Sequence, residues 1–115
     1  MLINKLFTGF ICLMTVMIAH GQSIKLMTYN IRLDVSSDGE NDWNHRKDFL
    51  VSQIQFNSPD IFGTQEGLPH QIDYIYKCLK HYKYLGSGRE SESKGESTSV
   101  FYDTTKFVVK FHETF

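Results

Sequence analysis

Two polar side chains, Asn30 and Glu66, each close a short apolar run of the kind that forms a buried strand. Asn30 lies near the end of Ile24–Arg32, and Glu66 ends the run Asp60–Glu66 further along the chain. Open α/β sheets bind their ligands at the carboxyl ends of strands. We therefore predict that Asn30 and Glu66 lie side by side at one edge of a sheet. Spacing alone also allows a turn asparagine and a surface glutamate that caps the following helix.

The chemistry that such a pair could support is hydrolysis of a phosphate ester. A carboxylate is a hard oxygen ligand suited to Mg²⁺ or Mn²⁺, which proteins usually hold with one or two carboxylates, water and substrate phosphate. The amide of asparagine can orient a phosphoryl oxygen or the carboxylate itself. Glu66 and Asn30 are therefore the candidate metal ligands and the candidate catalytic residues of the sequence.

A third candidate is Arg89, which follows the glycine-rich segment Gly86–Gly88. A guanidinium fits a phosphate or a carboxylate in a two-point grip. The glycines are weak evidence for a phosphate loop, because a dinucleotide fingerprint requires a third glycine and a helix directly after it. An arginine in an exposed loop is the alternative that remains open.

The polar segment Leu33–Asn44 is predicted to be a solvated loop near this site. Its acidic spacing partly follows an EF-hand calcium loop, but position 12 is His45 instead of glutamate, and a strand precedes it. Arg46 and Lys47 fall in the first turn of the following helix, where the helix dipole disfavours positive charge. One of them is therefore expected to bind a carboxylate or a phosphate. His70 is expected on a helix surface and not on a metal.

The elements that would position these residues alternate between strand and helix patterns. The predicted order is strand 24–32, helix 43–57, strand 60–66, helix 68–79, strand 82–85, loop 86–96, strand 97–102 and strand 107–114. Short strand–helix–strand connections pair their strands in parallel through right-handed crossovers. The second half has the pattern of an antiparallel meander. The predicted fold class is α/β.

The first 21 residues have the pattern of a cleavable secretory signal peptide. They contain Lys5, an apolar run over Leu6–Ala19 and small residues at the cleavage site. A membrane anchor is the alternative, but a run of about 14 residues is shorter than the roughly 20 that span a bilayer. We therefore expect a secreted or periplasmic protein with no stable membrane insertion after signal removal. Cys78 would then be its only cysteine, which excludes an intramolecular disulfide.

The charge balance limits how this chain could recognise a polyanion. It has 12 basic and 13 acidic residues and a formal net charge of −1, which gives no general attractive field. Recognition of nucleic acid or another phosphate ester must therefore be local. Nine Phe and six Tyr can supply a packed core, but a chain of this size buries only about 60 to 65% of its unfolded surface. We expect it to belong to something larger.

Several segments, taken together, carry a family resemblance. They are Met27–Arg32, Asp38–Trp43 with Arg46 and Lys47, Pro59–Glu66, Gly86–Arg89, and Gly95 and Glu96 before Phe101 and Tyr102. In these segments the chain resembles the amino-terminal half of the endonuclease/exonuclease/phosphatase superfamily, and more closely its secreted bacterial branch. The resemblance implies a four-layer α/β sandwich of mixed sheets with flanking helices, and metal-dependent cleavage of phosphoester bonds. It implies that Glu66 binds the metal beside an active-site Asn30, and that Arg89 and Glu96 have substrate-binding or structural roles.

The sequence departs from that family pattern in what it lacks. The remaining catalytic residues of the family, a central histidine, an Asp-x-Asn pair and a terminal Asp-His, lie in a second half that this sequence does not contain. We therefore expect a signal peptide over 1–21 and a partial domain over 22–115, truncated at its carboxyl end and inactive by itself. A non-catalytic remnant or binding module of the same fold is the alternative. The substrate stays open among nucleic acid, phospholipid and sugar phosphate, and no obligate protein partner is inferred.

Overall fold

The computed structural model describes residues 21–88 and 95–113 of the chain. Its elements, in order, are β1 (Leu26–Asn30), the 3₁₀ helix η1 (Ser36–Asn41), α2 (Trp43–Asn57), β2 (Ile61–Gly67), α3 (Pro69–Cys78), β3 (Tyr82–Gly88) and β4 (Ser97–Asp103). Apart from Gly21, the predicted signal peptide lies outside the described residues. Among the described residues, no helix is long and apolar enough to cross a bilayer.

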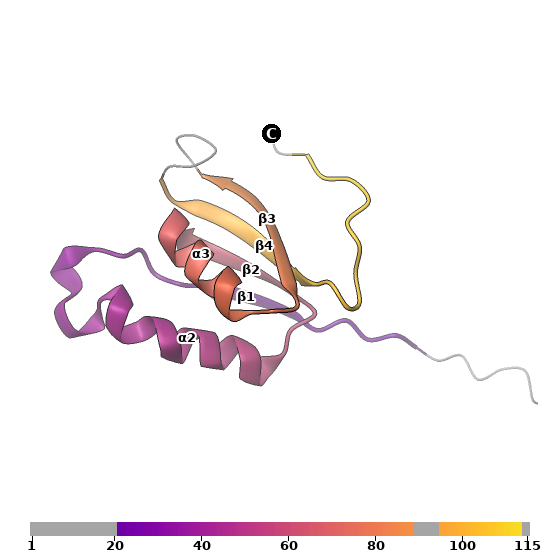
Figure 1. The fold of residues 1–115 in the computed structure, drawn as a ribbon, viewed down its shortest axis with the longest axis horizontal. Coiled ribbons are helices and arrows are strands. Elements are labelled where there is room, and N and C mark those ends of the chain that lie inside the picture. The colour runs from indigo at the N-terminus through magenta and orange to yellow at the C-terminus, as the bar shows by residue number, and fades with distance from the viewer. Residues whose placement is uncertain (1–20, 89–94, 114–115) are drawn as a thin grey trace, which may run out of the picture.

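The four strands form one mixed sheet in the order β1-β2-β4-β3 (Figure 1). β1 and β2 are parallel, with Asn30 opposite Gln65, and α2 connects them. The predicted parallel pair is therefore confirmed. β4 pairs antiparallel to both β2 and β3. The chain therefore reaches the far edge of the sheet at β3 and then returns, so that β4 lies between β2 and β3.

The helices begin and end at residues that suit those positions. Asp42 caps α2, because its side chain accepts a hydrogen bond from the His45 N–H at 3.0 Å. Ser58, in a left-handed conformation at φ 44°, ends α2 directly before Pro59. Pro69 opens α3, where its missing N–H has no helical partner to lose. Local sequence therefore fixes the two segments that pack on the sheet.

The core lies between the two helices and one face of the sheet. Phe62 of β2 and Phe101 of β4 stack at 4.6 Å between ring centroids, and both are fully buried. Ile54 of α2 and Ile75 of α3 are also fully buried in the same cluster. Burial alternates along β2, as expected for a strand with one covered face.

The opposite face of the sheet is open among the described residues. Leu26 of β1 and Val100 of β4 point to it, and they are 71% and 42% exposed. The four-layer sandwich implied by the family resemblance requires a second sheet on such a face. The described part of the chain contains the one sheet with its helices, an α/β arrangement of strands and helices in two layers.

Two predictions for the second half of the chain are wrong. β3 continues through Gly86 to Gly88 instead of ending at Leu85, because β4 pairs with it along its whole length. Residues 107–113, predicted as a strand, form none. A meander strand there would have to pair with β4, but β2 and β3 already occupy both edges of β4.

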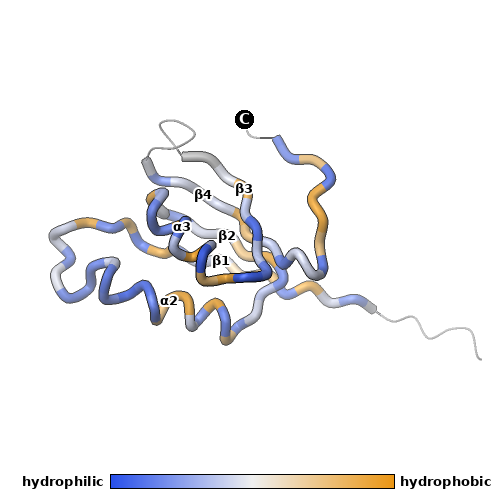
Figure 2. Tube along the Cα trace, viewed as in Figure 1, coloured by the Kyte–Doolittle hydropathy of each residue, from blue (hydrophilic) through white to orange (hydrophobic). Residues whose placement is uncertain are grey.

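The segment after β4 consequently leaves the sheet. Asp103 accepts hydrogen bonds from the N–H and the hydroxyl of Thr105, which forms a turn. Beyond this turn hydrophobic stretches alternate with hydrophilic ones, as Figure 2 shows, and the apolar Val108 and Phe111 are 77% and 80% exposed. High strand propensity over 107–111 was therefore insufficient, because the preceding strand β4 has no free edge to pair with.

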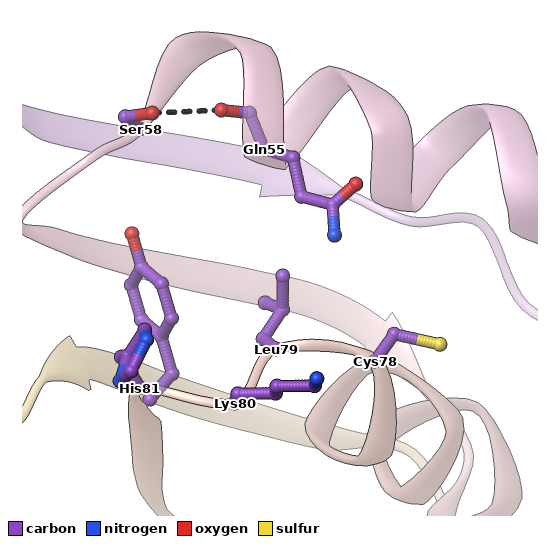
Figure 3. A pocket seen from close by; sticks show the side chains of 7 residues that line it. Gln55, Ser58, Cys78, Leu79, Lys80 and His81 are labelled. Atoms are coloured by element: carbon purple, nitrogen blue, oxygen red, sulfur yellow. Dashed lines mark hydrogen bonds between the residues drawn. The ribbon is translucent and has the colours of Figure 1, made fainter.

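A hollow of about 310 Å³ lies between the carboxyl ends of α2 and α3 (Figure 3). Its lining consists of Gln55, Ser58, Cys78, Leu79, Lys80, His81 and Tyr82. Tyr82 begins β3, which runs parallel to β2, so this hollow is at the end of the sheet opposite Glu66. It contains none of the candidate site residues.

Candidate active site at the carboxyl ends of β1 and β2

The side chains of Asn30 and Glu66 are in direct contact. Asn30 is the last residue of β1, and Glu66 lies one residue beyond its register partner Gln65 on β2. The Asn30 Nδ2 donates a hydrogen bond to the Glu66 Oε1 at 2.6 Å. Both side chains are exposed to solvent. The predicted juxtaposition at one edge of the sheet is thus present.

The backbone leaves regular strand geometry at Glu66 and at Arg32, two residues after Asn30. Glu66 has φ 61° and Arg32 has φ 58°, the left-handed region that side chains with a Cβ seldom adopt. The pairing of β2 with β4 is irregular between Thr64 and Gly67, around Glu66. Such conformations cost on the order of 1 to 3 kcal/mol each, and they cluster where function requires a particular side-chain direction. Glu66 has such a conformation, which gives its side chain a direction that a regular strand would not.

The hydrogen bonds of the Asn30 amide fix which way it faces. Its Oδ1 accepts from the Arg32 backbone N–H at 2.9 Å, so the oxygen side of the amide is directed toward Arg32. The NH₂ group therefore faces Glu66. On its other oxygen, Oε2, Glu66 accepts a hydrogen bond from the Leu33 N–H at 3.4 Å. Asn30 and the backbone of Leu33 together orient the carboxylate.

These donors to Glu66 are all electrically neutral. Glu66 forms no ion pair within the described part of the chain. The nearby Arg32 guanidinium instead pairs with Asp38 through two bonds, at 2.9 and 2.7 Å. The hydrogen bond to Asp38 is the main cause of the raised pKa of Arg32, and Glu66 adds a smaller electrostatic contribution. Within the described residues, the charge of Glu66 is therefore oriented but not paired with a cationic side chain.

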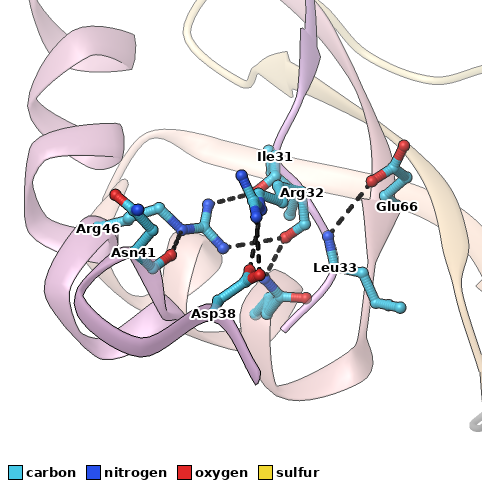
Figure 4. A network of polar contacts seen from close by, with 8 residues as sticks. Ile31, Arg32, Leu33, Asp38, Asn41, Arg46 and Glu66 are labelled. Carbon is cyan, nitrogen blue, oxygen red and sulfur yellow. Dashed lines mark hydrogen bonds and ion pairs between the residues drawn. The ribbon is translucent and has the colours of Figure 1, made fainter. Parts of the chain in front are cut away.

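Two further side chains converge on the loop that follows Asn30 (Figure 4). Arg46 of α2 donates to the carbonyl oxygens of Asn41, Ile31 and Arg32. Gln71 of α3, which is fully buried, donates through Nε2 to the Arg32 carbonyl at 3.0 Å. Among the described residues the guanidinium of Arg46 bonds backbone carbonyls and pairs with no carboxylate, so the expected carboxylate or phosphate partner of Arg46 or Lys47 stays a prediction.

The similarities of this chain to known proteins are similarities to solved structures. The sequence matches no protein-family model and no curated protein. An endonuclease/exonuclease/phosphatase family protein from Bacteroides thetaiotaomicron is 34% identical, with a TM-score of 0.74, over 78% of this chain and 33% of that one. A family protein from Bacteroides vulgatus is 33% identical, with a TM-score of 0.76, over 79% and 35%.

By fold, the chain belongs to the endonuclease/exonuclease/phosphatase proteins. A third structure, a mannosyl-6-phosphatase from Bacteroides thetaiotaomicron, is 35% identical with a TM-score of 0.73. It is matched over 77% of this chain and 34% of its own. The chain therefore spans about a third of the length of these endonuclease/exonuclease/phosphatase structures.

The donor set fits a divalent cation of the hard, hydrated kind expected for an endonuclease/exonuclease/phosphatase protein. Glu66 is exposed, and a carboxylate has about four lone-pair sites, of which two accept the hydrogen bonds above. Within residues 21–88 and 95–113, no group of three His, Cys, Asp or Glu could form a cage. One carboxylate with water and substrate phosphate is an arrangement that Mg²⁺ accepts.

The remaining candidates of the endonuclease/exonuclease/phosphatase resemblance are placed as follows. Arg89 lies outside the described residues. Glu96 directly precedes β4 and is half-buried, and its predicted role stays a prediction. His70 is half-exposed on α3, where its Nε2 lies 2.7 Å from the Asp34 Oδ2, so the predicted surface position is confirmed.

Sequence reasoning missed Gln71 as a site residue, although a signal was present. Gln71 is three residues after Leu68, the position from which a glutamine side chain can reach back to the first backbone N–H of a helix. Its Oε1 does accept from the Leu68 N–H at 3.0 Å. The contact to the Arg32 carbonyl could not be predicted, because it depends on how α3 packs beside β1.

Proposed function

We propose that this chain forms part of a divalent-metal-dependent phosphoesterase in which Glu66 binds Mg²⁺ or Mn²⁺. The observation that supports this most is the state of Glu66. It is an exposed carboxylate at the carboxyl end of a parallel strand pair, oriented by neutral donors, and no cationic side chain of residues 21–88 and 95–113 pairs with it. A carboxylate held in this way is suited to a cation from solution.

Each of the two residues has a distinct role in this proposal. When bound, the cation would neutralise charge that develops on the phosphoryl group. Glu66 supplies the anionic oxygen ligand. Asn30 holds the carboxylate through one N–H, and the second N–H of the same NH₂ group is available to a phosphoryl oxygen. The amide is therefore a positioning group for Glu66 and a candidate contact to the substrate.

The substrate class that we propose to test first is a sugar phosphate. One of the similar structures is a mannosyl-6-phosphatase, at 35% identity. Nucleic acid and phospholipid remain alternatives, because loops decide the substrate on a shared fold. Residues 1–21 are proposed to direct export, so the site would act outside the cytoplasm.

Binding of Mn²⁺ to the chain tests this proposal without requiring turnover. Electron paramagnetic resonance counts free Mn²⁺ in a titration of the native chain and of Glu66→Gln. We expect binding in the native chain and its loss in Glu66→Gln. The control is Asp73→Asn, which removes one exposed carboxylate of α3 that pairs with Lys77. Equal binding by all three proteins would contradict the proposal.

A graft tests the catalytic part of the proposal. The matching third of the Bacteroides mannosyl-6-phosphatase is replaced by the corresponding residues of this chain. We expect Mg²⁺-dependent phosphate release from 4-nitrophenyl phosphate, and none when the graft also carries Glu66→Gln. A folded graft that binds Mn²⁺ but releases no phosphate would contradict a catalytic role.

That outcome would favour the second candidate function, a non-catalytic binding module of the same fold. One observation supports this alternative. The described residues supply a single oriented carboxylate, and no three of their His, Cys, Asp and Glu side chains form a metal-binding group. Such a site could bind a hydrated cation with a phosphate and still lack a group to activate water.

A further inference from the structure

The carbonyl oxygen of Arg32 receives side-chain donors from both helices. Arg46 of α2 donates through Nη2 at 3.3 Å, and Gln71 of α3 donates through Nε2 at 3.0 Å. Arg46 also bonds the preceding carbonyl, that of Ile31, at 2.9 Å. Figure 4 shows the guanidinium between η1 and the end of β1. The two helices are thus tied to one peptide group just beyond the site.

The peptide groups on either side of Arg32 carry the two backbone donors of the site. The Arg32 carbonyl shares its planar peptide with the Leu33 N–H, which donates to Glu66 Oε2. The Ile31 carbonyl shares its peptide with the Arg32 N–H, which donates to Asn30 Oδ1. Arg32 itself has φ 58°, a left-handed conformation that is unfavourable for arginine. The hydrogen bonds to these two carbonyls, two of them from a charged group, can offset that cost and hold the direction of both N–H groups.

The side chain of Gln71 is shielded from solvent and bonds to backbone groups. It is fully buried, and its Oε1 accepts hydrogen bonds from the Leu68 N–H at 3.0 Å and the Asp34 N–H at 3.3 Å. Both ends of the amide are therefore satisfied by backbone groups. Replacement of Gln71 by an apolar residue would leave two partly buried N–H groups without this acceptor and the Arg32 carbonyl with one donor fewer.

We propose that Gln71 and Arg46 are positioning residues for the metal ligand Glu66. Both side chains fix the peptide between Arg32 and Leu33, whose N–H bonds Glu66 directly. Arg46 also fixes the peptide between Ile31 and Arg32, whose N–H bonds the Asn30 amide that holds the carboxylate. This inference rests on the proposed function, because it assigns the end of the chain of contacts to a metal ligand. Residues that orient a ligand typically contribute 10- to 100-fold to metal affinity.

The first measurement follows the Asn30 side-chain amide in the metal-free chain. Its two ¹H–¹⁵N signals in NMR report the hydrogen bonds to Glu66 and Arg32. We expect these signals to move toward free-amide values in Gln71→Met and in Arg46→Met. Matched controls are Gln55→Met and Lys47→Met, both on α2, which we expect to leave the Asn30 signals unchanged.

The second measurement is Mn²⁺ affinity in the same variants. We expect about 10-fold weaker binding in Gln71→Met and in Arg46→Met, the lower end of the range for orienting residues. Arg46→Lys, which keeps the charge and a single donor group, should recover part of that loss. A purely structural role would lower the thermal midpoint while leaving the Asn30 signals and the affinity of the folded protein as they are.

The outcomes separate the two proposals. If Glu66→Gln binds Mn²⁺ as tightly as the native chain, the metal function fails, and the Asn30 signals still decide whether Gln71 and Arg46 hold the amide. If Glu66→Gln loses binding while Gln71→Met and Arg46→Met keep native signals and affinity, the positioning role is overturned. Arg46 is only half-buried, so its variant provides the test even if Gln71→Met fails to fold.

Discussion

Two carboxylates, those of Asp60 and Glu66, lie near opposite ends of β2, and they differ in burial and in pairing. Asp60 precedes the strand and is only 6% exposed. Its Oδ2 accepts a hydrogen bond from the Lys25 N–H at 2.7 Å, and its Oδ1 is paired with the Lys106 ammonium group. The Asp60 carboxylate therefore joins the segment before β1 to the segment after β4, and the charge it brings is neutralised within the chain.

Glu66, near the other end of the same strand, is exposed, and among the described residues it accepts hydrogen bonds from an amide and a backbone N–H. At Asp60, the hydrogen bond from Lys106, followed by that from the Lys25 N–H, lowers the pKa of the carboxyl group. A carboxylate that the chain neutralises serves the fold. A carboxylate that the chain orients without neutralising it is suited to a ligand, which is the basis for assigning the site to Glu66.

The largest expected effect comes from removing the charge at Glu66. Residues that merely orient a ligand contribute up to about 100-fold to metal affinity, so loss of the ligand itself should exceed that. We expect Glu66→Gln to weaken Mn²⁺ binding by about 100-fold or more, with a thermal midpoint within about 2 °C of the native chain. Calorimetry and Mn²⁺ titration on the same samples measure both. A large fall in the thermal midpoint with unchanged Mn²⁺ binding would mean that Glu66, like Asp60, stabilises the fold and does not bind the metal.

Removal of the Asn30 amide should have an intermediate effect on the same side of the comparison. Asn30→Ala keeps the Glu66 charge but removes the donor at 2.6 Å. We expect Mn²⁺ binding about 30-fold weaker than in the native chain, between the effects of Glu66→Gln and Gln71→Met. Isothermal titration with Mn²⁺ provides the measurement. An effect as large as that of Glu66→Gln would indicate that Asn30 is itself a ligand.

At the other carboxylate we expect a change in stability alone. Asp60→Asn leaves Lys106 without its buried counter-charge, and we expect the thermal midpoint to fall by about 5 °C with Mn²⁺ binding unchanged. The matched control, Asp73→Asn, breaks an exposed pair with Lys77 and should change the midpoint by about 1 °C or less. Equal midpoints in the two variants would mean that the burial of Asp60 adds nothing to the stability of the fold.

The sequence predicted those parts of the fold and site that depend on neighbouring residues. The bounds of α2, the parallel pairing of β1 with β2 and the meeting of Asn30 with Glu66 all follow from local patterns. What it missed depends on contacts between distant segments. The predicted strand over 107–114 failed because β4 has no free edge, and the contact of Gln71 with the Arg32 carbonyl depends on how α3 packs beside the end of β1.

The smallest expected effect is a dependence on pH that belongs to Asp60. Its pKa in the folded chain is lower than in the unfolded chain, because Lys106 and the Lys25 N–H bind the ionised form. The unfolded state therefore takes up a proton first as the pH falls. The stability that Asp60 contributes is fully present above its unfolded pKa of about 4 and is lost as the pH falls through the folded pKa.

Other carboxylates with lowered pKa, such as Asp42 and Asp103, also weaken the fold in acid, so the native chain alone cannot isolate Asp60. The difference in thermal midpoint between the native chain and Asp60→Asn removes their contribution. We expect this difference to be constant from pH 7 to pH 5 and to narrow by about 2 to 3 °C on going to pH 3. A difference that stays constant to pH 3 would mean that the charge of Asp60 does not stabilise the fold, and the contrast with Glu66 would then rest on burial alone.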